Sequence, residues 1–285
     1  MKLAPECRSC LLEKVRTQSA FTISDTNKLD RIVAKCAGIY DAGYARKEGA
    51  AVTAGAVHRC CCAEVGIADL YTDIKTRDNK RAAEVLATVR PMLKTVHDAL
   101  IASVIGNAMD YGVTGHTVET DFTRFFETIF THGLAIDDSA KFLPLCKHVV
   151  FFTDNCGEVI FDMQFIKMLK ETGAHVTVVV KDGPMLNDVT QKEAEEIGIG
   201  RVADAVYTGG GGQQLGAHPE YFPPEVRTAV ENATLLIAKG LANYESLTEY
   251  DLQKPIAYLM MIKCDAVGRD VGAKKGDLVA FLRGA

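Results

Sequence analysis

The chain has 285 residues, of which 48% are hydrophobic and 24% charged, so it can bury one large core or two modest ones. Its formal net charge of −5 argues against a nucleic-acid-binding protein, because phosphate backbones are bound mainly by clustered Lys and Arg. We see neither a run of about 18 apolar residues nor the apolar region of a signal peptide, and we therefore expect a cytoplasmic protein with no membrane partner.

Up to about residue 140 the sequence pattern predicts helices. Apolar residues recur at three- and four-residue spacing in several segments, and Pro91 should kink or divide the longest of them. Gly133 is expected to end the last one. The predicted helical segments are residues 10–21, 27–40, 79–109 and 120–134.

From about residue 148 the pattern changes to short apolar runs rich in Val, Ile, Leu and aromatic residues, separated by amphipathic segments. Buried strands that alternate with helices predict an α/β fold, with a mostly parallel sheet and helices on both faces. We therefore divide the chain into residues 1–140 and 141–285, at a change of periodicity and not at a visible linker. The predicted strands are residues 148–154, 175–181, 202–208, 234–240 and 255–263.

Nine cysteines, an odd number spread over a mid-sized chain, do not suggest a secreted disulfide framework. Cys7 and Cys10 have the spacing of half a zinc site, and the triplet Cys60–Cys62 with His58 would be needed to complete four ligands. The chain has no second C-x-x-C motif. We favour ordinary reduced thiols and leave a metal or redox role open.

Each strand of the second half is followed by a polar or glycine-rich cluster. In an open parallel sheet, the loops that leave the carboxyl ends of the strands line one crevice, and ligands bind there. Five loops would thus deliver carboxylates, amides, lysines and glycines to a single edge. The clusters are Asp154, Asn155 and Glu158; Lys181, Asp182, Asn187 and Asp188; Gly209–Gly212; Lys239, Asn243 and Glu245; and Lys263 and Asp265.

Each cluster also has a purely structural interpretation. Asp154 and Asn155 can shape a tight turn, and Asp188 can act as a helix cap beside Thr190, which forms a capping-box pattern with Glu193. The run Gly209–Gly212 does not fit the dinucleotide fingerprint, so it either binds phosphate through backbone N–H groups or is simply flexible.

Taken together, the clusters predict metal-assisted phosphoryl chemistry. Asp154, the Asn155 amide oxygen and Asp188 are hard oxygen donors, which suit Mg²⁺ or Mn²⁺. Lys239 and Lys263 would neutralise a transferring phosphoryl group. Glu158, one helical turn after Asp154, would orient a metal-bound water.

Several ordered motifs resemble the domain-of-unknown-function 89 family, also called the damage-control phosphatase or acidic-residue methyltransferase-like family. The likeness covers nearly the whole chain, in the compact form found in archaea and bacteria. The motifs are Asp154 to Glu158 with Asp162, Gly183 to Asp188, Lys239 to Glu245, Gly106 to Gly112, and residues 68–82.

The resemblance implies a helical N-terminal region packed on a Rossmann-like three-layer α/β/α domain. It also implies a divalent metal held by Asp154, Asn155 and Asp188, and phosphatase activity on small, often damaged, metabolites such as sugar phosphates. The chain departs from the family pattern in two places: Cys156 stands where a small residue such as Ala is expected, and the loop Gly209–Gly212 lacks a serine often seen there.

Our leading hypothesis is a metal-dependent phosphatase for a small phosphorylated metabolite. Mg²⁺ or Mn²⁺ is the expected metal, with Co²⁺ or Ni²⁺ as alternatives. The sequence leaves open whether water or Asp154 attacks phosphorus, which substrate is used, and whether the chain forms oligomers. The expected catalytic residues are Asp154, Glu158 and Lys239, and the expected substrate contacts are Asn107, Asp110, Asn243, Glu245 and Lys263.

Two alternatives come from other classes of function. The family's second name suggests a carboxyl methyltransferase that uses S-adenosylmethionine, although this does not explain the oxygen donors and no glycine fingerprint follows the first strand. The other alternative is a non-catalytic protein that binds a phosphometabolite or a metal.

Overall fold

The structure of the protein is a computed structural model that describes residues 1–109 and 122–284, and all structural statements below concern these residues. Asp110, an expected substrate contact, lies outside them. The helices are α1 (Cys7–Ser19), α2 (Thr26–Ala45), α3 (Ala50–Val65), α4 (Thr72–Val89), α5 (Val96–Gly106), α6 (Phe122–His132), α7 (Ser139–Phe142), α8 (Glu158–Glu171), α9 (Gln191–Ile197), α10 (Pro224–Asn232), α11 (Gly240–Leu247) and α12 (Asp265–Val271).

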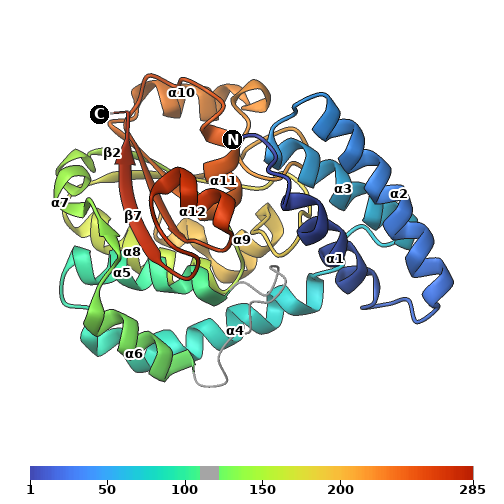
Figure 1. Cartoon of the computed structure of the whole chain (residues 1–285). Helices are drawn as coiled ribbons and strands as arrows, with labels where there is room; N and C mark the ends of the chain where they lie inside the picture. The colour runs from blue at the N-terminus through green and yellow to red at the C-terminus, as the bar shows by residue number, and fades with distance from the viewer. Residues whose placement is uncertain (110–121, 285) are drawn as a thin grey trace.

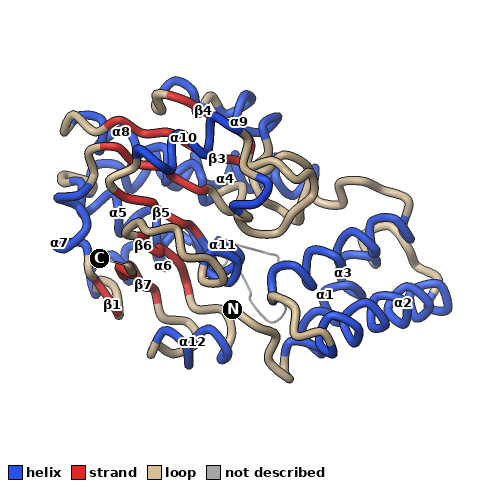
Figure 2. The backbone as a smooth tube through the Cα atoms, turned by 90° about the horizontal axis from the view of Figure 1, so that it is seen from above, coloured by secondary structure: helices blue, strands red, loops and turns tan. Residues whose placement is uncertain are grey.

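In the described part of the chain, seven strands form one sheet in the order β1-β7-β6-β5-β2-β3-β4 (Figures 1 and 2). Every neighbouring pair is parallel except β6 and β7. The strands are β1 (Ile136–Asp137), β2 (His148–Phe152), β3 (His175–Val180), β4 (Ala205–Thr208), β5 (Leu235–Lys239), β6 (Ile256–Met261) and β7 (Leu278–Arg283).

The two faces of the sheet are both buried, so the strands read as continuous apolar runs. Successive side chains still point to opposite faces: Phe151 packs with α4, α5, α6 and α8, whereas Phe152 packs with α10 and α11. Helices therefore cover both faces, and the predicted three-layer α/β/α class is confirmed.

Helices α1, α2 and α3, which we call the helical cap, lie together beside the sheet (Figures 1 and 2). They enclose a small core of their own that includes Val15, Ile32 and Val57. Helices α4, α5 and α6 instead contribute to the main core with the sheet. The division between residues 140 and 141 stays a prediction. The main core contains residues from both sides of it.

The five predicted strands appear as β2 to β6. Pro91 lies in a short 3-10 helix, Arg90–Met92, that separates α4 from α5, as its effect on helices requires. The sequence pattern did not single out β1, β7 or α3 as individual elements. In α3 small residues and cysteines occupy most positions, so its apolar periodicity is weak. No described helix has the length and apolar character needed to cross a membrane.

Candidate active site

The segment Asp154–Gly157 forms the turn between β2 and α8. Gly157 has φ +84°, and a Cβ at this position would lie 3.3 Å from Cβ of Asp78, so glycine meets both a backbone and a space requirement. The Gly157 N–H donates to Oδ1 of Asn79 from α4 at 2.6 Å. Helix α4 thereby holds the turn in place, and Asn79 is a supporting residue that sequence reasoning missed.

The turn after β2 and the loop after β3 are joined by backbone hydrogen bonds. Val189 N–H donates to the Asp154 carbonyl at 2.9 Å, and Cys156 N–H donates to the Asn187 carbonyl at 2.8 Å. These bonds bring Asp154, Asn155 and Asp188 to the wall of one cavity of about 180 Å³. The predicted convergence of these two loops at the carboxyl edge of the sheet is present in the structure.

The side chain of Asp154 is held from several directions. Oδ2 accepts hydrogen bonds from Nδ2 of Asn155 at 2.7 Å and Nδ2 of Asn107 at 3.1 Å. The same carboxylate lies against Gly240, where an added Cβ would come within 1.8 Å of Oδ2. Because the amide nitrogen of Asn155 faces Asp154, its carbonyl oxygen points away from that carboxylate.

Beneath Asp154, fully buried side chains form an ionic network between α5, α8 and β5. Lys239 Nζ lies 2.9 Å from Glu158 Oε1 and 3.0 Å from Asp162 Oδ1, and it donates to the hydroxyl of Ser103 at 2.7 Å. Asn107 Nδ2 donates to Glu158 Oε2 at 2.6 Å. Lys239 therefore contacts the carboxylates below the cavity and is not among the residues that line it.

The pKa values in this network follow from burial and charge pairing. Burial by itself lowers the pKa of Lys239, but the carboxylates of Asp162 and Glu158 outweigh it, so the net pKa is raised. Burial raises the pKa of Asp162, an effect that Lys239 opposes and Glu158 reinforces. The ammonium group is thus retained as the central cation of the network.

Residue spacing contained a signal for this network. Lys239 has the same parity in β5 as Leu235 and Ile237, which face α5 and α8. Ser103 and Asn107 are four residues apart, as are Glu158 and Asp162, so each pair lies on one face of its helix segment. Ser103 was not among the predicted site residues, and its role emerges only when α5 packs on α8.

Five other polar residues line the cavity itself, of which Glu6 and Lys14 lie on the side of the helical cap. Lys263 and Glu245 are also among them, and their role as substrate contacts stays a prediction. Asn187 also lines it, and its Nδ2 atom, buried in a side chain that is 1% exposed, has no hydrogen-bond partner among the described residues. A buried donor without a partner marks a place where a ligand acceptor gains a hydrogen bond.

Asn243 is fully buried and has a structural contact set. Its Nδ2 donates to the carbonyls of Thr153 at 3.0 Å and Lys239 at 2.7 Å, which ties α11 to the end of β2. It does not line the main cavity and instead borders a smaller one beside Lys181 and Gly209. Asn107 is equally enclosed, because its Oδ1 accepts from Met261 N–H at 2.9 Å.

The loop that carries Asp188 is also held by the helical cap. Leu186 has φ +50°, an unfavourable value for a side chain with a Cβ, and its N–H donates to Nε2 of His58 in α3 at 3.2 Å. His58 Nδ1 lies 3.0 Å from Oε1 of Gln18. Burial lowers the pKa of His58 to about 3, so the ring stays neutral and keeps an acceptor for Leu186.

Both departures from the family pattern have local explanations. The Cys156 side chain is fully buried in the main core, where burial raises the pKa of its thiol, and it behaves as a small apolar group. In the glycine run, a Cβ at Gly210 would lie 2.2 Å from the Tyr221 carbonyl and one at Gly211 would lie 2.8 Å from the Tyr221 ring. Close packing thus accounts for these glycines.

Thr190, not Asp188, is the N-cap of α9, and it forms the predicted capping box with Glu193.

The described residues contain no group of three or more His, Cys, Asp or Glu side chains arranged to hold a metal ion. The predicted ligand set contains only two such side chains, Asp154 and Asp188, because its third member is the amide of Asn155. All nine cysteines are free thiols, and Cys60–Cys62 lie in α3. Two carboxylates and an amide oxygen on one cavity wall fit a hard divalent cation better than zinc.

The fold and the site define an α/β protein with clustered oxygen donors at the carboxyl edge of a largely parallel sheet. A family model described as the damage-control phosphatase ARMT1-like domain matches residues 3–279, and the chain belongs to this family. The predicted family resemblance and the predicted phosphatase function, which is a hydrolase activity, are thereby confirmed.

Relatives of known sequence and structure extend over almost the full chain. A damage-control phosphatase of Archaeoglobus fulgidus is 36% identical, over 98% of this chain and 99% of the relative. A damage-control phosphatase of Pyrococcus horikoshii is 27% identical, over 99% and 98%. A crystal structure of a domain-of-unknown-function 89 family protein from Pyrococcus horikoshii matches with a TM-score of 0.89 at 26% identity, over 99% of both chains.

Proposed function

We propose that this protein is a divalent-metal-dependent phosphatase that hydrolyses a small phosphorylated metabolite. The observation that carries the proposal is the meeting of Asp154, Asn155 and Asp188 on the wall of one cavity, which Lys263 also lines.

Asp154, Asn155 and Asp188 would hold the metal, and Mg²⁺ or Mn²⁺ suits these oxygen donors best. When bound, the cation would polarise the phosphoryl group and favour a deprotonated water. The protein's own contribution is to orient the ligands. Asn107 fixes both Asp154 and Glu158 through one amide nitrogen, and Gly240 lets α11 approach the Asp154 carboxylate.

The buried network supports the site from below. Lys239 has its ammonium group directed at Glu158 and Asp162, and we propose that it positions Glu158 instead of contacting the phosphoryl group. Glu158 is within 3.4 Å of the Asn155 amide nitrogen, so its charge helps to set the orientation of that ligand. Asn243 would likewise act by joining α11 to β2.

Two cavity residues are suited to the phosphoryl oxygens. Lys263 supplies a positive charge at the cavity wall, and charge stabilisation is the main requirement of phosphoryl transfer. The Asn187 amide supplies a donor that no described residue uses. We propose both as direct contacts of the phosphate group.

Phosphate release from a panel of phosphomonoesters, measured with Mg²⁺, Mn²⁺, Co²⁺ or Ni²⁺, tests the proposal. We expect turnover with at least one metal. Asp154→Ala should lose both Mn²⁺ binding, measured by calorimetry, and turnover, by more than the roughly 10- to 100-fold typical of a residue that only supports a metal ligand.

Asp265→Ala is the matched control, because Asp265 follows β6 at the same edge of the sheet but is exposed and does not line the cavity. It should keep wild-type metal affinity and turnover. Turnover by Asp154→Ala at the rate of the control would refute the proposed ligand set, and no phosphate release under any metal would refute the proposed activity.

A further inference from the structure

The cavity beside the candidate metal ligands extends well beyond the space that a metal ion and a phosphate group would fill. From Asp154 and Asp188 it reaches to α1 and α3 of the helical cap, so the sheet and the cap each provide part of its wall. The organic portion of a bound phosphomonoester would therefore lie against the cap.

Apart from the predicted metal ligands, most residues in the cavity wall are apolar. Leu186, Leu215 and Leu241 line it on the sheet side. Leu3, Leu11 and Ala54 line it on the cap side.

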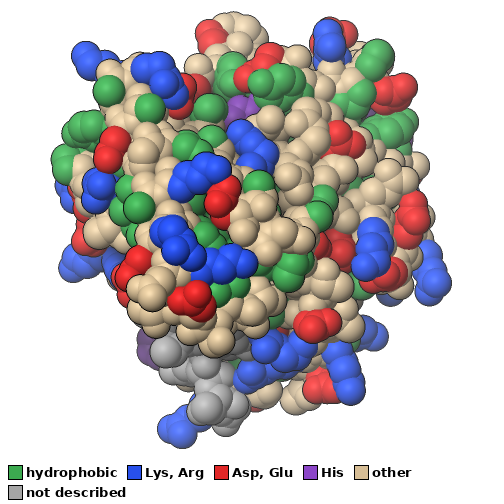
Figure 3. All heavy atoms as spheres, turned by 90° about the vertical axis from the view of Figure 1, so that its right-hand side faces the viewer, with side chains coloured by type: hydrophobic (Ala, Val, Ile, Leu, Met, Phe, Trp, Pro, Cys, Tyr) green, Lys and Arg blue, Asp and Glu red, His purple; other side chains and the backbone are tan. Residues whose placement is uncertain are grey.

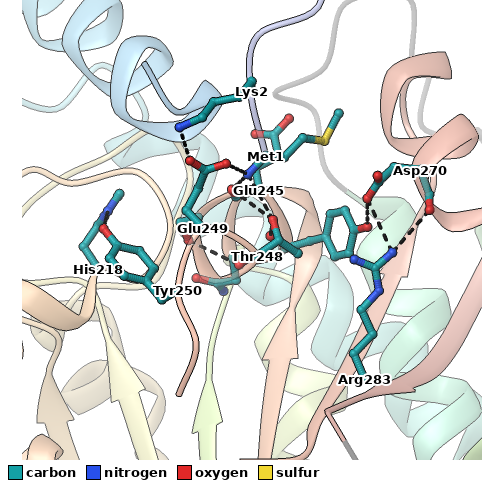
Figure 4. Close-up of polar contacts among 12 residues, drawn as sticks. Met1, Lys2, His218, Glu245, Thr248, Glu249, Tyr250, Asp270 and Arg283 are labelled. Carbon is teal, nitrogen blue, oxygen red and sulfur yellow. Dashed lines mark hydrogen bonds and ion pairs between the residues drawn. The ribbon is translucent and has the colours of Figure 1, made fainter. Parts of the chain in front are cut away.

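These apolar side chains belong to packed clusters and form a fixed surface. Leu186 and Leu215 are buried in a cluster with Tyr71 and Met185, against which Ala54 packs. Leu3 and Leu11 pack on the core of the helical cap. The segment before α1 is tethered to α11, because the amino group of Met1 donates to the Glu245 carbonyl at 2.6 Å and Lys2 pairs with Glu249 (Figure 4).

Three thiols in the cavity wall add to its apolar character. Cys7 and Cys10 from α1 and Cys264 from the loop after β6 all line the cavity. Burial raises the pKa of each, to about 11 for Cys264, so they are neutral thiols near pH 7. A neutral thiol behaves as a small, polarisable hydrophobic group, which assigns the Cys7 and Cys10 pair a role in the wall.

Charged side chains are sparse in this part of the cavity. Glu6 is exposed and its carboxylate pairs with Arg269. Lys14, Glu245 and Lys263 are the other charged residues of the wall besides the predicted metal ligands. A sugar carries a hydroxyl on nearly every carbon and needs a hydrogen-bond partner for each one that is buried, and this wall offers few.

We infer that the cavity selects phosphomonoesters whose organic portion is largely apolar, in preference to polyhydroxylated sugar phosphates. As a statement about which esters are hydrolysed, this inference rests on the proposed phosphatase function. As a statement about binding, it depends only on the shape and chemistry of the wall.

A homologous series of ethyl, butyl and hexyl phosphate, compared with glucose 6-phosphate, tests the inference in the presence of Mn²⁺. Each buried methylene should raise kcat/KM about two- to fourfold, or roughly 16- to 250-fold from ethyl to hexyl phosphate. Glucose 6-phosphate should be used less efficiently than hexyl phosphate. Calorimetric binding of the corresponding non-hydrolysable alkylphosphonates should show the same order.

Leu11→Asn replaces a cavity side chain by a polar one of similar size and should flatten the dependence on chain length. Leu12→Asn is the matched control, since Leu12 is also half-buried on α1 and packs on the same core but does not line the cavity. It should keep the wild-type dependence, which separates a local effect from a loss of folding.

The two arms distinguish failure of the inference from failure of the proposed function. Hydrolysis that is independent of chain length, or faster with glucose 6-phosphate, would overturn the inference and leave the phosphatase intact. Chain-length-dependent binding of the phosphonates without hydrolysis of any ester would support the inference and overturn the phosphatase. Absence of both binding and hydrolysis would overturn both.

Discussion

The two sides of the candidate active site are built on different principles. On the sheet side, polar and charged residues are buried and fixed by one another, with Asn107, Glu158 and Lys239 each fully enclosed. On the side of the helical cap, aliphatic side chains and thiols form most of the wall, together with Glu6 and Lys14. The cap joins the loops of the sheet through a few polar contacts, such as Arg59 Nη1 to the Gln213 carbonyl at 2.7 Å and the bond between Leu186 and His58.

If both proposals hold, this difference assigns reaction chemistry and ligand selection to separate parts of the fold. A network of buried charges tolerates little change, because removing one partner leaves another charge without compensation. An apolar wall tolerates substitution by residues of similar volume.

The outer face of the cap is ordinary protein surface, with Lys and Arg interspersed among Asp and Glu (Figure 3).

The largest expected effect is that of Gly240→Ala on the sheet side. The new Cβ would lie 1.8 Å from Asp154 Oδ2, so the carboxylate or the start of α11 must move. We expect loss of Mn²⁺ affinity and of phosphatase activity by more than about 100-fold, as for a disrupted metal ligand. Calorimetry and phosphate release measure the two quantities.

Gly272→Ala is the control for backbone strain. Gly272 has φ +81°, close to the +75° of Gly240, but a Cβ there would have no atom within 4 Å. It should cost only about 1–2 kcal/mol of unfolding free energy and leave metal affinity unchanged. Equal metal affinity in the two variants would show that the close approach of α11 to Asp154 is unimportant.

The second prediction concerns the charge beneath the site. Lys239→Met leaves Glu158 and Asp162 buried without their cation, which should lower the unfolding free energy by roughly 3–5 kcal/mol. Urea denaturation measures the loss. The pair of Lys170 and Asp204 is 2.5 Å apart but partly exposed, so Lys170→Met should cost at most about 1 kcal/mol.

Neutralising the two carboxylates provides the decisive comparison. The triple variant Lys239→Met, Glu158→Gln, Asp162→Asn should recover part of the lost stability, because no uncompensated charge is left. A triple variant less stable than Lys239→Met alone would mean that the ammonium group contributes through packing and not through its charge.

The sequence predicted the sheet and the candidate site in unequal measure. Buried parallel strands are visible as apolar runs, and polar residues that follow them fall at one edge by geometry, which is why Asp154, Asn155 and Asp188 could be grouped. The alternation of side chains along β5 places Lys239 on the same face of the sheet as Leu235 and Ile237. This pattern indicates that Lys239 faces α5 and α8, although we predicted a contact with the phosphoryl group. The contacts of Asn107 and Ser103 depend on how α5 packs against α8, and no local pattern specifies that packing.

The third prediction tests the link from the helical cap to the loop that carries Asp188, a proposed metal ligand. His58→Leu removes the acceptor of the Leu186 N–H and should cost about 1–3 kcal/mol at neutral pH. Because burial lowers the pKa of His58 from 6.5 to about 3, its stabilising contribution is complete above pH 6.5 and is lost as pH falls toward 3. The stability gap between wild type and variant should therefore narrow in acid.

Urea denaturation of both proteins at pH 7.5 and pH 5 measures this gap. Each pH unit below 6.5 is expected to remove up to about 1.4 kcal/mol of the difference. A gap that is the same at both pH values would exclude a buried neutral imidazole. A variant as stable as wild type at pH 7.5 would show that the strained Leu186 needs no support from the cap.

The smallest expected effect on the unfolding free energy is that of Glu245, which lines the cavity from α11. Its pH dependence has the opposite sign to that of His58. Burial raises the pKa of this carboxyl from 4.5 to about 7, while the Met1 amino group and Lys14 act in the other direction. The folded state therefore favours the protonated acid. Its contribution to stability is complete below pH 4.5 and is lost as pH rises through 7.

Glu245→Gln removes the ionisation, so its stability should gain on wild type as pH rises from 4.5 to 7. Because the side chain is only half-buried, the gain per pH unit should stay below the roughly 1.4 kcal/mol of a full proton. If the unfolding free energies of the two proteins change with pH in parallel, the Glu245 carboxylate lies in a water-like environment. The cavity wall would then be more polar than its aliphatic lining indicates, and the preference for apolar phosphoesters would be correspondingly weaker.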